Sequence, residues 1–233
     1  MRAHRSLAPL IWAAGLVVAV ALYGAFLYAP TEKTMGTIQR IFYFHATAGM
    51  MGLFAFLFVF AGSVAFLATR NLRWDRLAEA SAEAGLVFNS IVLVTGPIWA
   101  KPVWGIWWTW DARLTSFFVL WFLCWAYLLL RAYVARPARR ATLSAVVGIL
   151  GAIDVPIVYF SIRWWRTQHP APVIGGGDGS GLAAPMMHAF LAAFVGYALL
   201  FAVFVSLRGR LAEAETEVDA LAREIRDEGR SLS

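Results

Sequence analysis

Three of the four histidines lie near the ends of apolar segments, where an imidazole is well placed to bind a metal. His45 lies in IFYFHATAGM, His169 in RWWRTQHPAP and His188 in APMMHAF. Imidazole is the commonest metal ligand in proteins, and haem iron takes it as an axial ligand. His45 and His169 together therefore predict a site with two imidazole ligands. The alternatives are a hydrogen bond between helices for His45, simple solvation for His169 and a structural role for His188.

A tryptophan-rich segment, WAKPVWGIWWTWDARLT at residues 99–115, is the second unusual feature, with five tryptophans within twelve residues. If the segment is helical, one face carries Trp104, Trp107, Trp108 and Asp111. If it is extended, one face carries Trp104, Ile106, Trp108 and Trp110. Either geometry produces an aromatic shelf suited to a flat apolar ligand such as haem. The alternative is a belt of tryptophans at the membrane interface, where this residue is enriched.

The remaining ligand types narrow the choice of metal. Cys124 is the single cysteine, and neither HExxH nor CxxC occurs, so zinc and thiol-exchange sites are disfavoured. Because CxxCH is also absent, any haem is expected to be held without covalent attachment. Arg113, with Lys101 and Arg166 behind it, is the predicted partner of the haem propionates, since basic side chains pair well with carboxylates. Positioning at lipid headgroups is the alternative for these three residues.

The elements that carry these residues are predicted from composition and hydropathy. Apolar residues make up 61% of the 233 residues and charged residues 15%, and the mean hydropathy is +0.66, as in integral membrane proteins. Six apolar runs approach or exceed the length of a bilayer span, and none alternates as a barrel strand does. We therefore predict an all-α integral membrane protein, a bundle of six transmembrane helices with an interfacial tryptophan-rich outer loop at 100–114. The predicted helices cover residues 10–28, 41–68, 84–99, 115–134, 142–161 and 182–207.

Basic residues set the expected orientation. If the N-terminus is cytoplasmic, the inner segments hold eleven arginines, whereas the outer loops hold six basic residues. This bias favours both termini in the cytoplasm. The net charge of +6 is then explained by the bias and by anionic lipid rather than by nucleic-acid binding. The tryptophan-rich loop and the three histidines share the outer face.

The sequence also allows predictions for the C-terminal tail and for the fifth apolar segment. Residues 1–207 are expected to form one membrane domain, and residues 208–233 a cytoplasmic tail. Apolar residues at spacings of three and four predict an amphipathic helix in the tail, which covers the cytoplasmic end of the bundle or meets a partner subunit. Pro156 predicts a kink in the fifth segment. Asp154 is expected to bond a neighbouring helix or to stay protonated, with a proton or translocation role as the alternative.

Three stretches of the sequence resemble a known family. WGIWWTWDARLTS, YFHATAGM and DVPIVYFSIRWWRTQHP are similar to the tryptophan-rich (WWD) family of haem-handling proteins in bacterial cytochrome c maturation, and most closely to its CcmC branch. The resemblance covers nearly the whole chain. It implies non-covalent haem b on the periplasmic face of the inner membrane, with His45 and His169 as axial ligands. The implied shelf consists of Trp104, Trp107, Trp108, Trp110 and Asp111. His188 has no counterpart in the family pattern.

The resemblance also implies a role and partners. Haem would be presented or transferred to the periplasmic chaperone CcmE, with help from the ABC-type subunits CcmA and CcmB and the small membrane protein CcmD. The chain has no GxxxxGKS/T motif, so ATP hydrolysis is assigned to a partner, and a binding and delivery protein is expected rather than an enzyme. A permease that itself translocates haem or another small molecule is one alternative. A haem redox protein is another, although its histidines would normally lie deeper on facing helices.

Overall fold

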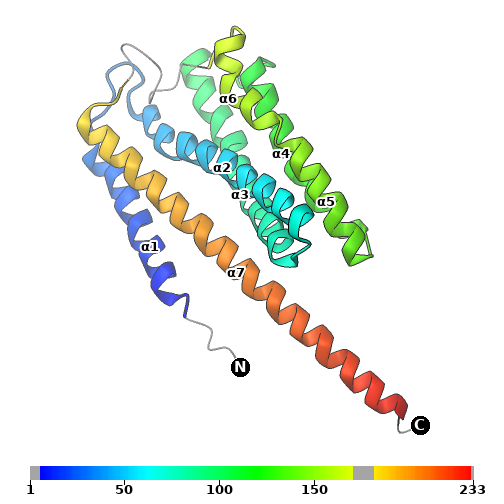
Figure 1. The fold of residues 1–233 in the computed structure, drawn as a ribbon. Helices are drawn as coiled ribbons and strands as arrows, with labels where there is room; N and C mark the ends of the chain where they lie inside the picture. The colour runs from blue at the N-terminus through cyan, green and yellow to red at the C-terminus, as the bar shows by residue number, and fades with distance from the viewer. Residues whose placement is uncertain (1–5, 170–180, 232–233) are drawn as a thin grey trace.

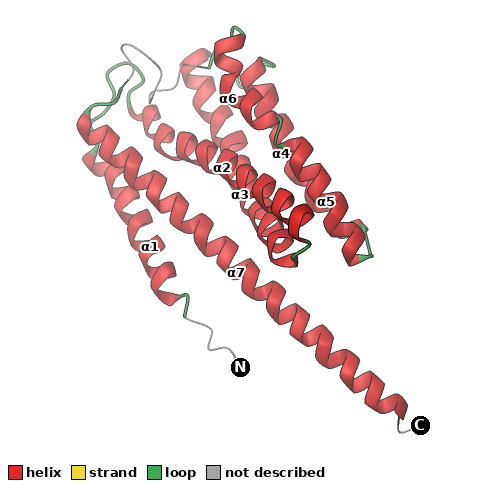
Figure 2. Cartoon of the chain, in the orientation of Figure 1, coloured by secondary structure: helices red, strands yellow, loops and turns green. Residues whose placement is uncertain are grey.

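The computed structural model describes residues 6–169 and 181–231, and most of these residues are helical (Figures 1 and 2). The helices are α1 (Ala8–Tyr23), α2 (Ile41–Thr69), α3 (Leu72–Trp104), α4 (Ala112–Tyr133), α5 (Pro137–Gly151), α6 (Asp154–Trp164) and α7 (Ala184–Ser231). A π-helical turn at Gly24–Tyr28 extends α1, and a 3-10 turn at Thr37–Arg40 leads into α2. Arg2 and Arg5, which contribute to the expected orientation, lie outside the described residues.

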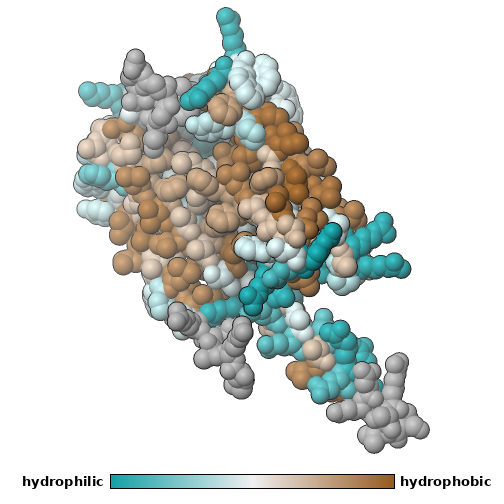
Figure 3. Space-filling view, in the orientation of Figure 1, coloured by the Kyte–Doolittle hydropathy of each residue, from teal (hydrophilic) through white to brown (hydrophobic). Residues whose placement is uncertain are grey.

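Six helical stretches within the described residues are long and apolar enough to cross a membrane. On the face shown in Figure 3, apolar side chains form a band between hydrophilic ends. Successive spans run in opposite directions, so the first span, α3 and α6 all end at one end of the bundle, which we call the site end (Figure 1). α1 begins and α7 ends at the other end, the tail end. The prediction of an all-α integral membrane protein with six spans is confirmed.

The third span is longer than the sequence suggested. The prediction covered residues 84–99, whereas α3 runs from Leu72 to Trp104. Its first turns are rich in alanine and glutamate, which favour a helix, but the charged side chains among them lower the hydropathy. Asn71 caps the start, because its side chain accepts a hydrogen bond from the Arg73 N–H. The helix therefore starts three turns before the apolar run that was used to predict it.

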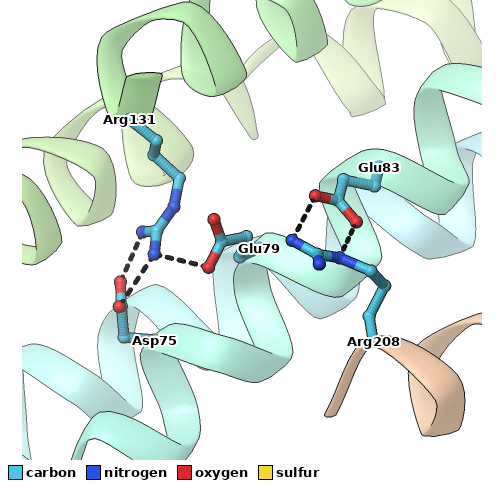
Figure 4. Close-up of polar contacts among 5 residues, drawn as sticks. All are labelled: Asp75, Glu79, Glu83, Arg131 and Arg208. Carbon is cyan, nitrogen blue, oxygen red and sulfur yellow. Dashed lines mark hydrogen bonds and ion pairs between the residues drawn. The ribbon is translucent and has the colours of Figure 1, made fainter. Parts of the chain in front are cut away.

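Ion pairs with two neighbouring helices hold the polar start of α3 in place (Figure 4). Arg131 of α4 donates to Asp75 at 2.7 Å and to Glu79 at 2.7 Å. Arg208 of α7 pairs with Glu83 one turn further along. Since the three carboxylates are spaced by four residues, they lie on one face of α3. That face is shared between α4 and α7 at the tail end.

The fifth span consists of two helices rather than one kinked helix. α5 ends at Gly151, and α6 begins at Asp154. The proline ring of Pro156 would clash with the carbonyl of Ala152 in a continuous helix, and the break falls at that carbonyl. Asp154 is 9% exposed, and its Oδ2 has no hydrogen-bond partner among the described residues. The break thus lies a few residues before the proline that was predicted to cause a kink.

α2 and α3 approach each other closely because small residues line their contact. A Cβ atom on Gly62 would lie 2.8 Å from the carbonyl oxygen of Trp74 and 3.1 Å from the Cβ of Ala78. A Cβ on Gly85 would lie 3.1 Å from the Cβ of Ala55. Small residues at a helix contact allow close backbone packing where lipid provides no hydrophobic driving force. α2 carries His45 near its start, so this contact also fixes His45 relative to α3.

We expect Gly62→Ala to destabilise the bundle by about 1–3 kcal/mol, because the new methyl group meets backbone that cannot move aside. Gly15→Ala is the matched control, since a Cβ on Gly15 of α1 would meet nothing within 4 Å. Alanine favours helix by up to about 1 kcal/mol over glycine, so the control is expected to be neutral or stabilising. Unfolding in mixed SDS micelles measures both variants. Equal stability of the two variants would contradict close packing at Gly62.

α7 is one continuous helix that leaves the bundle at the tail end (Figure 1). Near the site end it packs against α1 through small residues, including Ala21, Ala25 and Ala189. Beyond Arg208, residues expected to form a short tail helix continue α7 without a break. The apolar side chains of this part are exposed: Leu211, Val218, Leu221 and Ile225.

Candidate functional site

His45 and His169 lie at the site end, within electrostatic range of each other, although α3 to α6 separate them in the chain. His45 lies in the second turn of α2, and His169 follows the end of α6. His45 is close enough to His169 and to Arg113 to interact electrostatically with both side chains. Both histidines are half-buried. The structure therefore brings together the two predicted ligands and the predicted propionate partner.

Consecutive turns of α3 surround the imidazole of His45. Its Nδ1 lies 2.9 Å from the Oγ1 of Thr95. The ring of Trp99 meets the imidazole edge-on, with centroids 5.6 Å apart and planes at 69°. A Cβ on Gly96 would lie 3.4 Å from the Cε1 of His45, so a glycine here lets the ring sit against the helix backbone. One helix thus fixes the position and the plane of this imidazole.

His169 lies in an open pocket at the end of α6. The backbone N–H of His169 donates to the Oγ1 of Thr167 at 3.0 Å. The pocket has a volume of about 560 Å³, and its wall includes Trp164, Trp165 and Arg166. The two indoles are 57% and 52% exposed. We did not predict this tryptophan pair as part of the shelf, although the run RWWRTQH beside the histidine was the signal for it.

The tryptophan-rich segment is neither one helix nor a strand. α3 ends at Trp104, and Gly105 terminates it with a left-handed backbone (φ 77°), which glycine adopts without strain. Residues 105–111 are irregular, and α4 begins at Ala112. The helical alternative is therefore wrong for the segment beyond Trp104. The contact between Trp108 and Trp110 joins residues two apart, with ring centroids at 5.6 Å.

The segment presents aromatic surface in two directions. Trp107 and Trp110 are 58% and 71% exposed. Trp108 packs inward against Phe118 of α4, with centroids 6.0 Å apart. Phe118 in turn stacks on Trp121 at 6.0 Å, so an aromatic cluster continues along α4. Trp110 also meets Phe118 edge-on, with centroids 5.9 Å apart, so Trp108 and Trp110 are both anchored to α4 although Trp110 remains largely exposed.

Asp111 and Arg113 both have structural contacts. Asp111 caps α4, because its Oδ1 accepts from the Leu114 N–H at 3.0 Å. Arg113 donates from Nη1 to the Val158 carbonyl of α6 at 2.6 Å, which ties α4 to α6. Lys101 donates to the Gly105 carbonyl at 2.8 Å and so closes the end of α3. Of these contacts, only the one between Arg113 and Val158 joins distant parts of the chain, whereas the capping aspartate could have been indicated by its place before α4.

His188 is positioned differently from the other two histidines. It is exposed on α7, its Nδ1 lies 3.1 Å from the hydroxyl of Tyr28, and the two rings stack at 6.2 Å. The contact connects the start of α7 to the end of the first span. This geometry agrees with the structural alternative for His188.

The residues at the site end fit a haem. Two imidazoles on separate elements can approach one iron from different sides, and flat indoles flank them. The buried indole N–H groups of Trp99 and Trp108 have no hydrogen-bond partner among the described residues, so polar donors are available to a ligand. Within the described part of the chain, no group of three or more His, Cys, Asp or Glu side chains forms a metal site of another type. Haem therefore suits this donor set.

Comparisons with known proteins agree with this geometry. A family model described as heme exporter protein C (CcmC) matches residues 1–224. A heme exporter protein C of Bradyrhizobium diazoefficiens is 34% identical over 187 residues, which are 80% of this chain and 70% of the relative. A heme exporter protein C of Escherichia coli is 39% identical over 160 residues, 66% of this chain and 63% of the relative. A putative cytochrome c biosynthesis ccmC-like mitochondrial protein of Marchantia polymorpha is 31% identical over 194 residues, 83% of this chain and 82% of the relative.

The family model covers most of the chain, and two of these relatives exceed 30% identity over most of it, so the chain belongs to the heme exporter protein C (CcmC) family of multi-pass membrane proteins.

Proposed function

We propose that the protein binds haem b without covalent attachment at the site end and presents it to the periplasmic chaperone CcmE. Membership of the CcmC family indicates a role in haem handling for cytochrome c maturation. The observation that carries the finer proposal is that His45 lies within electrostatic range of His169, with indole rings beside each imidazole: Trp99 at His45, and Trp164 and Trp165 at His169. Both ligands are near one end of the bundle, so a haem held there is accessible to a second protein.

Each part of the site has a distinct task in this proposal. His45 and His169 would hold the haem through imidazole nitrogens, and the haem would supply an iron that accepts such ligands. Trp104, Trp107, Trp108, Trp110 and Asp111 form the cradle and the docking surface. Arg113 pairs with a propionate through the guanidinium nitrogens that do not bond to Val158, because arginine carries five N–H donors.

The proposal includes an orientation and partners. The site end faces the periplasm, and the tail end, with both termini, faces the cytoplasm of a bacterial inner membrane. The excess of arginine at the tail end supports this orientation. CcmA and CcmB supply ATP hydrolysis, since the chain carries no nucleotide-binding motif, and CcmD completes the complex. The chain itself acts as a binding and delivery protein rather than as an enzyme.

We expect the purified chain in nanodiscs to take up one haem with a six-coordinate spectrum. After reconstitution with CcmA, CcmB and CcmD, it should transfer that haem to the soluble domain of CcmE. The absorbance of the separated proteins measures the transfer. A chain that takes up no added haem would overturn the proposal. Haem flux into sealed vesicles by the chain alone, without gain by CcmE, would favour the permease instead.

A further inference from the structure

Among the described residues, Thr95 of α3 is the polar side chain in hydrogen-bond contact with the imidazole of His45. The Oγ1 of Thr95 lies 2.9 Å from the Nδ1 of His45. The same oxygen lies 2.6 Å from the carbonyl oxygen of Ile91, one turn earlier in α3. Thr95 is therefore placed between a backbone carbonyl and a predicted iron ligand.

The two contacts determine which group donates. A threonine hydroxyl has one hydrogen and two lone pairs, and the Ile91 carbonyl can only accept. The hydroxyl of Thr95 therefore donates its hydrogen to the Ile91 carbonyl, and toward His45 it can only accept a hydrogen bond. The shared hydrogen of the second contact must then be on Nδ1 of the imidazole. A neutral imidazole that carries its hydrogen on Nδ1 keeps the lone pair of Nε2, which is the ligand atom.

We propose that Thr95 is a positioning residue that selects the Nδ1–H tautomer of His45 and directs its Nε2 toward the haem iron. This inference rests on the proposed haem site. Metal-binding histidines nearly always donate their other ring N–H to a second group, which fixes the ring and makes the ligand nitrogen more basic. A hydroxyl bonded to a helix carbonyl is a fixed acceptor, so it suits that task.

The surroundings of His45 restrict the ring in the same way. Gly96, the next residue of α3, allows the imidazole to approach the backbone, and Trp99 packs edge-on against the ring one turn later. Threonine often bonds to the carbonyl four residues earlier without any further role. What distinguishes Thr95 is that the second lone pair of the same hydroxyl is directed to a histidine from another helix.

Thr95→Val and Thr95→Ser separate positioning from packing. Valine has nearly the same shape but cannot accept a hydrogen bond, whereas serine keeps the hydroxyl and its bond to Ile91. We expect Thr95→Val in nanodiscs to lose haem to excess apomyoglobin about 10–100-fold faster than the wild type. The low-spin ferric electron paramagnetic resonance signal should shift, because His45 becomes a weaker or tilted ligand. Thr95→Ser is expected to restore both properties.

A measurement without haem tests the tautomer directly. Nitrogen-15 chemical shifts of the imidazole in the haem-free wild type should identify Nδ1 of His45 as the protonated nitrogen. A hydrogen on Nε2 would overturn the inference, and this test does not depend on the folding of any variant. Wild-type haem retention and resonance in Thr95→Val would also overturn it, while leaving the proposed function intact. A wild type that binds no haem would overturn both this inference and the proposed function.

Discussion

Alanine in place of His45 or His169 is expected to abolish the six-coordinate haem spectrum and to weaken haem retention by about 100-fold or more. Each substitution removes one of the two proposed iron ligands, and a loss of this size corresponds to about 2.7 kcal/mol. The loss of haem retention need not be the same in the two variants. α3 contacts the His45 imidazole through Thr95 and Trp99, whereas His169 follows α6 in a non-helical segment. Absorption spectra and competition with apomyoglobin measure both effects.

His188→Ala is the matched control for these two variants. His188 lies at the same end of the bundle but contacts Tyr28 rather than the other histidines. Its loss should lower stability by about 1 kcal/mol, the usual contribution of a hydrogen bond, and leave the haem spectrum unchanged. If the His45 and His169 variants retain haem as the control does, the two histidines are not its ligands. The tryptophan-rich segment is then explained as a belt at the membrane interface.

The six spans could be predicted because long apolar runs have few structural alternatives in a membrane. The start of α3 was not predicted, because it does not lie in a long apolar run. Residues 72–83 are too polar to resemble a span, and the arginines that neutralise their carboxylates come from α4 and α7. Only tertiary structure shows that these charges are paired. The same limitation applies to the break before α6, which Pro156 indicated but did not locate.

The candidate site could be predicted in its residue types but not in its geometry. The histidines and tryptophans stand out in the sequence, yet their mutual approach depends on how α2, α3, α4 and α6 pack. Gly105 and Asp111, which end one helix and begin the next, carried the local signal that residues 105–111 are irregular. Thr95 carried no such signal, because its neighbour His45 is fifty residues away in the chain. The periodicity of apolar residues predicts helices, but it does not indicate which side chains form hydrogen bonds between them.

Arg131→Met is expected to destabilise the bundle by about 3–5 kcal/mol, because it leaves two carboxylates unpaired where water is largely excluded. The side chain of Arg131 is 4% exposed, that of Asp75 is 9% exposed and that of Glu79 is 25% exposed. Arg131 makes hydrogen bonds to both carboxylates (Figure 4). Unfolding in mixed SDS micelles, followed by circular dichroism, measures the loss. The proposed haem site lies at the opposite end of the bundle, so the folded fraction should still bind haem.

Arg208→Met provides the comparison, since it removes a similar ion pair on the same face of α3. The side chains of Arg208 and Glu83 are each 33% exposed, so water can solvate the carboxylate that remains. We therefore expect a loss of about 1 kcal/mol or less. Equal effects of Arg208→Met and Arg131→Met would show that burial does not determine the contribution of these pairs.

A triple variant distinguishes unpaired charge from lost packing at Arg131. Arg131→Met with Asp75→Asn and Glu79→Gln removes all three charges and keeps similar side-chain volumes. Neutral amides are much less costly to bury than carboxylates, so most of the lost stability should return. Arg131 also lies over the ring of Tyr127, with its guanidinium carbon 5.7 Å from the ring centroid. If the triple variant is as unstable as Arg131→Met alone, the loss comes from packing of the arginine side chain, such as its contact with Tyr127 within α4, rather than from unpaired carboxylates.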